Sequence, residues 1–515
     1  MKKIFFYLSL CLMAGGMRAQ NPIVSHCYTA DPAPVAFEGE DSLYVYCDED
    51  MNVPGVHDFY YMNRWRVYST VDMVNWTDHG IAMPREAFSW GKDGTCWASQ
   101  CIKKGQYYYW YMCLSKPGDW RHYIGVGYSK KPSGPFKDPI KKPLFDTGEG
   151  GDIDPTVFID DDGKAYLYWG NNKLRYARLT SVMMGVDTRI GKNGVVEVPL
   201  TKEAFGGVKV KEGDKEVIDG VDCYEEGPWL FKRGDNYYLM YSAGGVPEHI
   251  SYSMSKSPTG PWEYKGKVMS QDNNTGSFTN HSGMVHYQGK DYFFYHTGWA
   301  KGGGGFNRSM AVEEMYFNAD GTIKPVTATR KGVKALRAMD PYVRQQAETL
   351  NAAYGISVVG DESKGVYVTD IHANDSMRVA NVDFGTEGAR SFTVRVASTG
   401  GNGSLIVRQD NARGRILGKF KIEKTGGDDI WEERTFDLTQ TPSGVHDVYF
   451  SFSGVDSNTL FNWDWWQFNA VPSAVEHVEA SPRSDSSFFY TLQGTPVENP
   501  TRGVYIKNGR KILVK

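Results

Sequence analysis

Residues 153–170 read Ile-Asp-Pro-Thr-Val-Phe-Ile-Asp-Asp-Asp-Gly-Lys-Ala-Tyr-Leu-Tyr-Trp-Gly, and this stretch decides the predicted fold. An acidic residue before proline opens it, a short apolar segment follows, and an Asp-Gly turn leads into an aromatic segment. β-Branched and aromatic residues on both sides of a tight turn are typical of two paired strands. The stretch therefore predicts a β-hairpin with a carboxylate at the start of its first strand.

The same phrase recurs along residues 31–328. Each time, a polar or acidic residue beside proline or a small residue is followed by a strand, a turn and an aromatic strand. The five starts lie 66, 57, 72 and 55 residues apart, at Asp31, Trp97, Asp154, Glu226 and His281. Five units of about 60 residues, each with room for four short strands, predict an all-β chain whose residues 21–335 form a five-bladed β-propeller. A β-sandwich with chance similarity between segments is the alternative.

The composition agrees with many short strands and argues against other classes. The 515 residues include 32 Tyr, 25 Phe, 14 Trp and 57 Gly, which is more aromatic than a disordered chain and richer in glycine than a helical bundle. The 57 Lys and Arg nearly balance the 61 Asp and Glu, for a net charge of −4. Since nucleic acid binding requires a positive surface, we expect no nucleic acid partner.

Residues 1–20 have the pattern of a secretory signal peptide. Lys2 and Lys3 are followed by an apolar stretch at residues 4–13 and by small residues at the exit. This stretch is too short to span a bilayer, which needs about 20 apolar residues, and no longer apolar segment follows. We therefore expect a chain without a membrane span that is secreted to the periplasm, the cell surface or the medium. The six later cysteines leave one or two disulfides open.

The character of the chain changes near residues 331–345. Residues 340–471 contain short alternating strands such as Ser391-Phe-Thr-Val-Arg-Val and no helical pattern, which predicts a β-sandwich. Residues 472–515 are expected to form a polar linker and a tail that ends in a strand-like segment.

Three of the five repeat starts carry a carboxylate: Asp31, Asp154 and Glu226. The first strand of each propeller blade lines the central channel, so these acids are expected to converge on one funnel. Two carboxyl groups across a pocket are the minimum for breaking a glycosidic bond, because one protonates the leaving oxygen while the other activates water or attacks. Taken singly, each acid could instead be a turn or capping residue.

Four phrases make residues 21–330 resemble glycoside hydrolase family 43. They are Thr29-Ala-Asp-Pro-Ala-Pro, the stretch quoted above, Tyr224-Glu-Glu-Gly-Pro-Trp-Leu and Phe278-Thr-Asn-His-Ser-Gly, in this order. The resemblance implies an inverting glycosidase that needs no cofactor for its chemistry. Its expected substrate is a plant polysaccharide such as arabinoxylan, or its oligosaccharides, from which it removes arabinofuranosyl or xylosyl residues.

The resemblance also implies a role for each acid and adds three pocket residues. Asp31 becomes the general base, Glu226 the general acid, and Asp154 the residue that orients the acid and tunes its pKa. Trp97 is expected to stack on a sugar, Arg308 to bond sugar hydroxyls, and His281 to help hold a calcium ion on the channel axis; a core tryptophan, a surface ion pair and a core histidine are the structural alternatives. For the whole chain, the alternatives are an arabinan- or galactan-directed glycosidase of this family and a propeller that binds carbohydrate without cleaving it.

Residues 345–470 resemble a family 6 carbohydrate-binding module, on phrases such as Asn462-Trp-Asp-Trp-Trp-Gln-Phe. The resemblance assigns Trp431 and Asn462 to a sugar site, although Ser376 and Val379 stand where that family has aromatic residues. A packing or spacer role is the alternative for this domain.

Two further features depend on resemblance alone. Glu348 and Asp464 match positions of a structural calcium ion, which prefers oxygen ligands. The tail from Tyr490 resembles, in shortened form, the C-terminal sorting sequences of secreted Bacteroidetes proteins, with a small extra hairpin as the alternative.

Overall fold

The computed structural model describes residues 20–56, 59–270, 275–361, 365–455, 459–470, 488–492, 494–507 and 510–514. The predicted signal peptide, apart from Gln20, and the predicted linker at residues 472–487 lie outside this set. Within it the regular secondary structure is almost entirely β-strand, with one four-residue helix, α1 (Lys202–Phe205), and one 3₁₀ turn (Arg85–Ala87). None of the described helices is long and apolar enough to cross a membrane.

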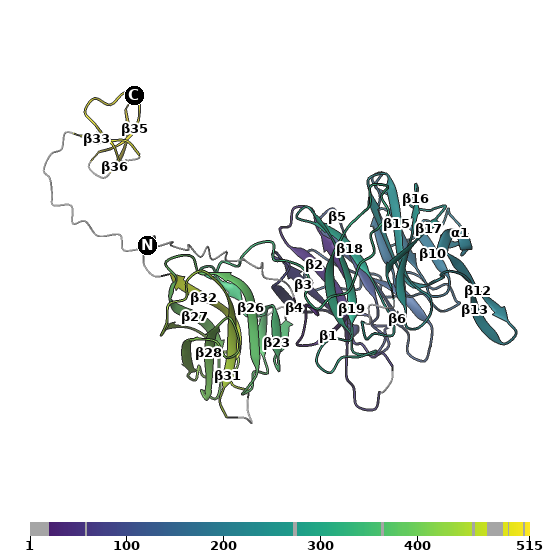
Figure 1. Ribbon diagram of the computed structural model, residues 1–515, viewed down its shortest axis with the longest axis horizontal. Coiled ribbons are helices and arrows are strands. Elements are labelled where there is room, and N and C mark those ends of the chain that lie inside the picture. The colour runs from purple at the N-terminus through teal and green to yellow at the C-terminus, as the bar shows by residue number, and fades with distance from the viewer. Residues whose placement is uncertain are drawn as a thin grey trace, which may run out of the picture. The chain divides into compact units, whose positions relative to one another are not determined.

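Five antiparallel sheets follow one another along the chain as the blades of a propeller (Figure 1). Blades I and II consist of β1 (Tyr28–Ala36), β2 (Leu43–Asp50), β3 (Arg64–Thr70) and β4 (Trp76–Pro84), and of β5 (Ser99–Lys104), β6 (Tyr107–Ser115) and β7 (His122–Ser129). Blade III consists of β8 (Thr156–Ile159), β9 (Ala165–Trp169), β10 (Leu174–Leu179) and β11 (Val195–Val198). Blades IV and V consist of β14 (Tyr224–Arg233), β15 (Asn236–Ala243), β16 (His249–Ser255) and β17 (Glu263–Met269), and of β18 (Gly283–Tyr287), β19 (Lys290–Thr297) and β20 (Ser309–Met315). The predicted five-bladed propeller is confirmed.

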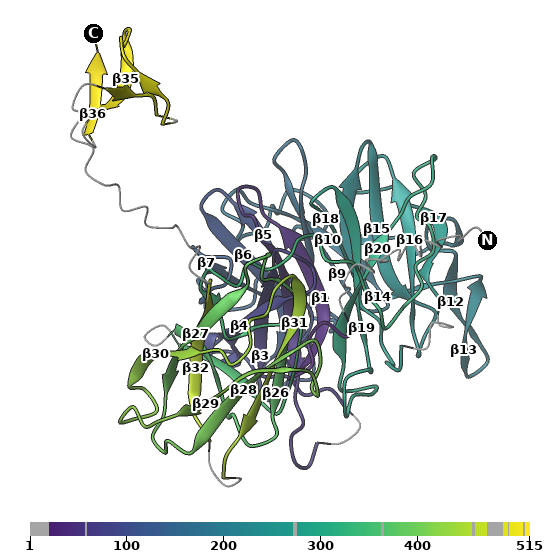
Figure 2. The ribbon, with the colours of Figure 1, turned by 60° about the vertical axis from the view of Figure 1, so that its left-hand side comes forward.

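The first strands of the five blades form the inner ring. β1, β5, β8, β14 and β18 each contact the first strand of the neighbouring blade, and β1 meets β18 where the ring closes. The blades pack by both faces, so middle strands such as β6 and β15 are buried along nearly their whole length. A strand that is buried on both faces has apolar or aromatic residues at nearly every position, which explains the aromatic runs in the sequence. A hairpin of β12 (Gly207–Glu212) and β13 (Lys215–Gly220) projects from the propeller (Figure 2).

Two sheets of a β-sandwich follow the propeller, as the alternating sequence pattern predicts. The first contains β21 (Gln345–Gln346), β24 (Ser357–Asp361), β25 (Gly365–Thr369), β27 (Ala389–Ala397), β30 (Trp431–Asp437) and β32 (Asn462–Ala470). The second contains β23 (Ala352–Tyr354), β26 (Ser376–Asp383), β28 (Gly403–Gln409), β29 (Ile416–Ile422) and β31 (Val445–Ser453). Side chains from both inner faces, among them Phe392, Phe450 and Trp466, form one core.

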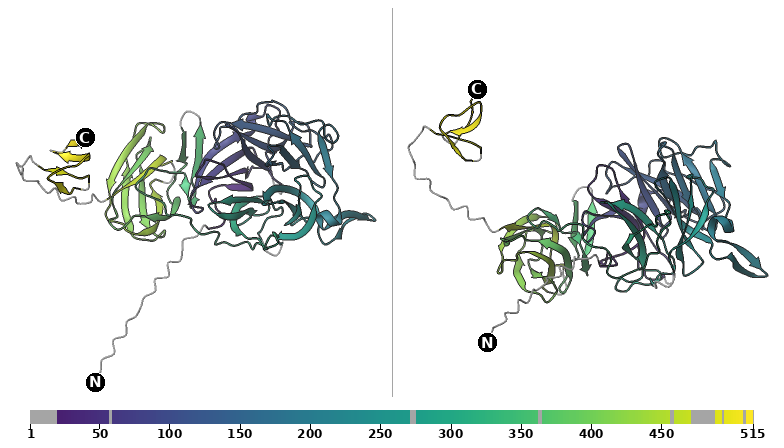
Figure 3. Two further views of the ribbon diagram at one scale, coloured as in Figure 1. Left: turned by 90° about the horizontal axis from the view of Figure 1, so that it is seen from above. Right: turned by 45° about the horizontal axis from the view of Figure 1, so that its top comes forward.

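The sandwich and the propeller form one compact unit that ends at Asn469. β22 (Thr349–Leu350) pairs with β4 and becomes the fifth strand of blade I. Figure 3 shows the green strands of the sandwich beside the purple strands of that blade. Asn75 bonds both the N–H (2.8 Å) and the C=O (2.9 Å) of Ala380 across this junction. A shared sheet and buried hydrogen bonds therefore join the two.

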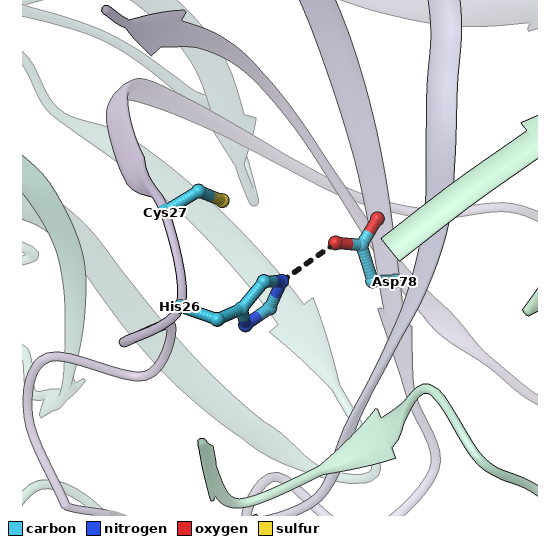
Figure 4. Close-up of side chains that lie close together, drawn as sticks. All are labelled: His26, Cys27 and Asp78. Atoms are coloured by element: carbon cyan, nitrogen blue, oxygen red, sulfur yellow. Dashed lines mark hydrogen bonds and ion pairs between the residues drawn. The ribbon is translucent and has the colours of Figure 1, made fainter. Parts of the chain in front are cut away.

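His26, Cys27 and Asp78 lie together near this junction (Figure 4), with possible metal-ligating atoms within 4.8 Å of one another. The Asp78 carboxylate, however, already has several partners. It accepts from His26 Nε2 (2.8 Å), from Arg66 Nη1 (3.0 and 3.1 Å) and from the N–H of Gly80 (2.7 Å). Since an arginine on these oxygens repels a cation, the cluster is best described as a buried ion-pair network that holds the N-terminal segment against blade I.

The last described residues form a separate unit, residues 470–515. Its strands β33 (Phe489–Tyr490), β34 (Pro496–Val497), β35 (Gly503–Lys507) and β36 (Arg510–Val514) pair in one small antiparallel sheet. The sorting role expected from the tail stays a prediction. The cysteines from Cys27 to Cys223 are all free thiols, so the described part of the chain contains neither of the disulfides that the sequence left open.

We predict that Asn75→Ala destabilises the whole unit. The substitution leaves the buried N–H and C=O of Ala380 without partners, which should lower the free energy of unfolding by about 2–4 kcal/mol. Urea denaturation followed by tryptophan fluorescence measures this, with Asn402→Ala, an exposed asparagine of the sandwich, as the matched control. Equal stability of the two variants would show that the junction contributes nothing.

Candidate active site

The three predicted acids lie where the inner strands begin with irregular backbone. Asp31 and Asp154 have left-handed φ angles of 49° and 57°, and Glu226 precedes Gly227 with a φ of 59°. The pairing register shifts beside Asp31 in β1 and on both sides of Glu226 in β14. Non-glycine residues rarely adopt this conformation, and such bulges change the direction of a side chain. The irregularities turn these carboxyl groups toward the central channel.

One pocket of about 460 Å³ receives all six residues that the sequence predicted for the propeller. This volume falls in the range typical of small-molecule sites. The residues come from all five blades or the segments that lead into them: Asp31, Trp97, Asp154, Glu226, His281 and Arg308. Convergence of positions that are up to 277 residues apart is what the repeat phase predicted.

Asp31 is the acid with cationic and imidazole neighbours. Arg308 Nη1 donates to its Oδ1 at 3.1 Å, and the Nδ1 atoms of His296 and His281 lie 3.2 and 3.9 Å from the same oxygen. Burial alone would raise the pKa of Asp31, but Arg308 and His296 outweigh it and hold the pKa far below its usual value. Asp31 is therefore ionised at neutral pH, the state that a general base requires.

Arg308 differs from the sequence expectation. Its guanidinium makes a two-point contact with Asp50, Nε to Oδ2 and Nη2 to Oδ1 at 3.0 Å each, in addition to its bond to Asp31. Nη1 also donates to Thr279 Oγ1 (3.3 Å), and the group lies 4.5 Å from the ring centre of Tyr60. The structure thus gives Arg308 a role in keeping Asp31 charged and in place, because Asp31, Asp50 and Thr279 take the donors that were expected to bind sugar hydroxyls.

Glu226 and Asp154 have uncharged partners instead. Asn171 Nδ2 donates to Glu226 Oε2 at 2.5 Å, and the N–H of Gly227 donates to Asp154 Oδ2 at 2.9 Å. Burial raises the pKa of Glu226, which the Asn171 bond opposes and the charge of Asp31 reinforces. Burial and the neighbouring Glu226 raise the pKa of Asp154 well above its usual value. The pocket therefore favours the proton-bearing form of Glu226, as a general acid needs.

Asp154 acts on the acid through the backbone in this geometry. Its bond to Gly227 fixes the peptide that follows Glu226. The orienting and pKa-tuning role that the resemblance implied for Asp154 stays a prediction.

Four residues of the site were missed by the sequence analysis: Asp50, Asn171, Glu248 and His296. Asp50 ends β2 and His296 lies in β19, so neither stands at a first strand, where the analysis looked for acids. Glu248 is a buried pocket acid whose Oε2 accepts from the N–H of Asn280 at 2.8 Å. Burial and Glu226 raise the pKa of Glu248. For Glu248, the available signal in the sequence was an acidic residue at the end of a loop, directly before the third strand of blade IV.

Trp97 and His281 lie in the pocket wall. Trp97 stacks on His122 with ring centres 3.9 Å apart, which fixes the plane of its indole. Burial lowers the pKa of His281 to about 4, so this imidazole is neutral at pH 7. A neutral imidazole can bind a cation through a nitrogen, and the calcium role expected for His281 stays a prediction.

The two residues predicted to form the sugar site of the sandwich, Asn462 and Trp431, have partners within the domain. Asn462 is buried, its Oδ1 accepts from Thr369 Oγ1 (2.7 Å), and its Nδ2 donates to the carbonyl of Asp428 (2.7 Å). The amide is therefore used inside the domain, because two neighbouring segments need it as a cross-link. Trp431 packs edge-on against Tyr367 with ring centres 5.2 Å apart and lies 5.1 Å from the Arg395 guanidinium.

The two expected calcium ligands have unlike surroundings. Glu348 is buried, and among the described residues its Oε2 has no hydrogen-bond partner. Asp464 forms an ion pair with Arg395. Burial raises the pKa of Glu348 well above its usual value, and nearby Asp464 adds to this.

A five-bladed propeller whose channel pocket combines an ionised Asp31 with three carboxyl groups of raised pKa defines a class of glycoside hydrolases. The chain belongs to glycosyl hydrolase family 43, whose model matches residues 19–323, and it carries a family 6 carbohydrate-binding module, matched at residues 346–470. It is therefore a glycosidase.

Several known proteins are similar to this chain along much of its length. An arabinoxylan arabinofuranohydrolase of Bacillus subtilis (strain 168) is 32% identical, over 87% of this chain and 92% of the relative. A xylosidase/arabinosidase of Bacteroides ovatus is 30% identical, over 58% of this chain and 94% of the relative. The crystal structure of a family 43 arabinoxylan arabinofuranohydrolase from Bacillus subtilis in complex with cellotetraose superposes with a TM-score of 0.72 at 28% identity, covering 88% of this chain and 99% of that one.

We predict that Asn171→Ala raises the pKa of Glu226. Asn171 stabilises the charged form of this carboxyl, so its removal favours the protonated form. A general acid loses activity as pH rises through its pKa, so the basic limb of the kcat/KM profile should move upward by about 0.5–1 pH unit. The control is Asn318→Ala, on an exposed turn. A limb that stays in place or moves downward would contradict this assignment.

Proposed function

We propose that this glycosidase removes arabinofuranosyl or xylosyl residues from arabinoxylan or its oligosaccharides, with inversion at the anomeric carbon. One observation carries the proposal: the pocket separates an Asp31 held ionised by Arg308 from a Glu226 with neutral partners. The names of the relatives, which cover nearly the whole chain, support the substrate class.

The proposed reaction is a single displacement. Glu226 gives its proton to the glycosidic oxygen, so the bond between that oxygen and the anomeric carbon breaks without release of an alkoxide. A water on the opposite face of the sugar loses a proton to Asp31 as its oxygen bonds to the anomeric carbon. Asp154 keeps the backbone at Gly227, and hence Glu226, in position. The two carboxyl groups supply both proton transfers, so this chemistry requires no cofactor.

Two alternatives have weaker support. An arabinan- or galactan-directed activity is represented among the relatives by an endo-α-(1→5)-L-arabinanase of Bacillus subtilis, at 23% identity over 67% of this chain. A propeller that binds sugar without cleaving it would have no use for a buried carboxyl group kept in the protonated form, since burying such groups costs stability. The arrangement of the acids would serve hydrolysis of arabinan as well, so the choice of arabinoxylan is supported by the names of the relatives that cover nearly the whole chain.

We predict that variants of Glu226 and Asp31 respond differently to the leaving group of the substrate. Glu226→Ala should lower kcat/KM on arabinoxylan by about 10³-fold, yet lower it far less on a dinitrophenyl arabinofuranoside or xyloside, whose phenolate leaves without a proton. Asp31→Ala should reduce both by about 10³-fold, because both need an activated water. Glu38→Ala, at an exposed acid, is the control.

Initial-rate assays on both substrates, with NMR of the first sugar released, measure these effects. Equal losses for Glu226→Ala on the two substrates would contradict the acid assignment, and a product that retains its anomeric configuration would contradict inversion.

We further propose export of the chain, on the signal pattern of residues 1–20, and a structural calcium ion in the sandwich. The buried, unpartnered Oε2 of Glu348 is a suitable calcium ligand among the described residues. Asp464 would supply a second carboxylate oxygen through Oδ1, because Arg395 takes Oδ2. A family 43 β-xylosidase/α-arabinofuranosidase from a compost microbial metagenome has been crystallised with xylotriose in a calcium-free form; its TM-score is 0.51 at 28% identity, over 61% of this chain and 98% of that one. Calcium is thus proposed here as a stabilising ion only.

The calcium proposal predicts a Glu348-dependent response to chelation. EDTA should lower the Tm of the parent protein by about 2 °C or more, because an ion that binds only the folded state stabilises it. Glu348→Gln should show no such response, whereas Glu387→Gln, at an exposed position in the same domain, should respond as the parent does. Differential scanning fluorimetry with added calcium or EDTA decides this, and equal responses in all three proteins would contradict the site.

A further inference from the structure

Trp120 is exposed at the mouth of the active-site pocket. Its accessible fraction is 74%, and it is the only tryptophan in the described part of the chain that is exposed rather than buried or half-buried. It lies in the turn between β6 and β7 and contributes to the pocket lining. An indole in water forgoes the stabilisation that burial would give, so its position at the mouth of a site calls for an explanation.

The turn that carries Trp120 is held firmly. Its neighbours Asp119 and Arg121 form an ion pair, with Arg121 Nη2 to Asp119 Oδ2 at 2.8 Å and the N–H of Arg121 to Asp119 Oδ1 at 3.0 Å. Tyr123 OH donates to the same carboxylate, and the N–H of Asp119 donates to the carbonyl of Lys116 at 3.0 Å. The exposed ring therefore stands on a turn that is already ordered, which reduces the entropy lost when a ligand binds.

The outer edge of the Trp120 indole lies close to a glycine. Gly150 has a left-handed φ of 77°, and a Cβ there would lie 2.9 Å from the indole of Trp120. Gly150 belongs to the segment that leads through Gly151 and Ile153, both in the pocket wall, to Asp154. The indole thus rests on the backbone beside the catalytic acids.

A second exposed aromatic ring lines the same pocket. Phe59 is 59% exposed, and its ring centre lies 6.2 Å from that of Trp97. Phe59 belongs to blade I and Trp120 to blade II, so apolar faces occur on the rims of two neighbouring blades. A pocket of about 460 Å³ can enclose the sugar that is cleaved off, but the rest of a polysaccharide must lie outside it, over this rim.

We propose that Trp120 is a stacking platform for a xylopyranosyl unit of the main chain next to the branch that is removed. The inference rests on the proposed function and specifies it: the platform recognises the polymer, and the pocket recognises the branch. The C–H face of a pyranose packs on an aromatic ring much as another apolar group does, and the ordered turn presents that ring toward solvent at the pocket mouth.

The test compares two substrates in the full-length enzyme. Trp120→Ala should raise KM for arabinoxylan about tenfold, and it should change kcat on that polymer and kcat/KM on nitrophenyl α-L-arabinofuranoside far less. Trp120→Phe should restore part of the affinity, because a smaller ring keeps a stacking face. Tyr316→Ala, at an exposed aromatic residue in the segment after β20 and outside the pocket lining, is the control.

Each other outcome overturns the platform in a distinguishable way. Equal losses on polymer and aryl glycoside would mean that Trp120 only supports the pocket structure, and no change on either would mean that the ring contacts no substrate. A parent enzyme that cleaves the aryl glycoside but not arabinoxylan would overturn both the polymer substrate and the platform. Inactivity of the parent on both substrates would instead contradict the proposed function on which the platform depends.

Discussion

The buried guanidinium of Arg308 sets the charge distribution of the active site. It directly precedes β20 in blade V, yet it bonds Asp50 at the end of β2 and Asp31 in β1, both in blade I. The interaction thus joins the last blade to the first at the point where the ring closes. A buried carboxylate without a cation would take up a proton instead of staying charged. Arg308 therefore keeps Asp31 ionised in the pocket.

The opposite character of Glu226 follows from where the cation is placed. Blades III and IV bring only neutral donors to the other acids, the amide of Asn171 to Glu226 and the N–H of Gly227 to Asp154. Burial then acts on these groups without a compensating charge and favours their protonated forms. The propeller thus places an ionised carboxylate and a carboxyl group that favours its proton on different blades of one ring, so that similar carboxyl groups acquire different protonation states through their partners.

The sequence could predict the acids because their positions depend on periodicity. Asp31, Asp154 and Glu226 each lie at or near the start of a first strand. The starts of the first strands meet at the central channel, regardless of the length or conformation of the loops. Their partners have no such signal, since His296 lies in a second strand and Asn171 in a loop. Contacts of this kind depend on local breaks in strand register, and one shifted residue reverses the side on which a side chain lies. The fold could thus be predicted from the repeat pattern, whereas the protonation states of the pocket acids depend on contacts that only the structure shows.

In the sandwich, too, the strands could be predicted from the sequence but their contacts could not. One of these contacts joins the sandwich and the propeller into one unit. Its alternating strands were predictable, but a two-residue strand such as β22 has no detectable period. Without β22, β4 would be the outer edge of blade I, with unpaired backbone groups open to association. Blade I also carries Asp31 and Asp50, so covering its edge stabilises the sheet that holds the base. Because the amide of Asn462 is used within the domain, completing this blade is the role of the sandwich for which the structure gives direct contacts.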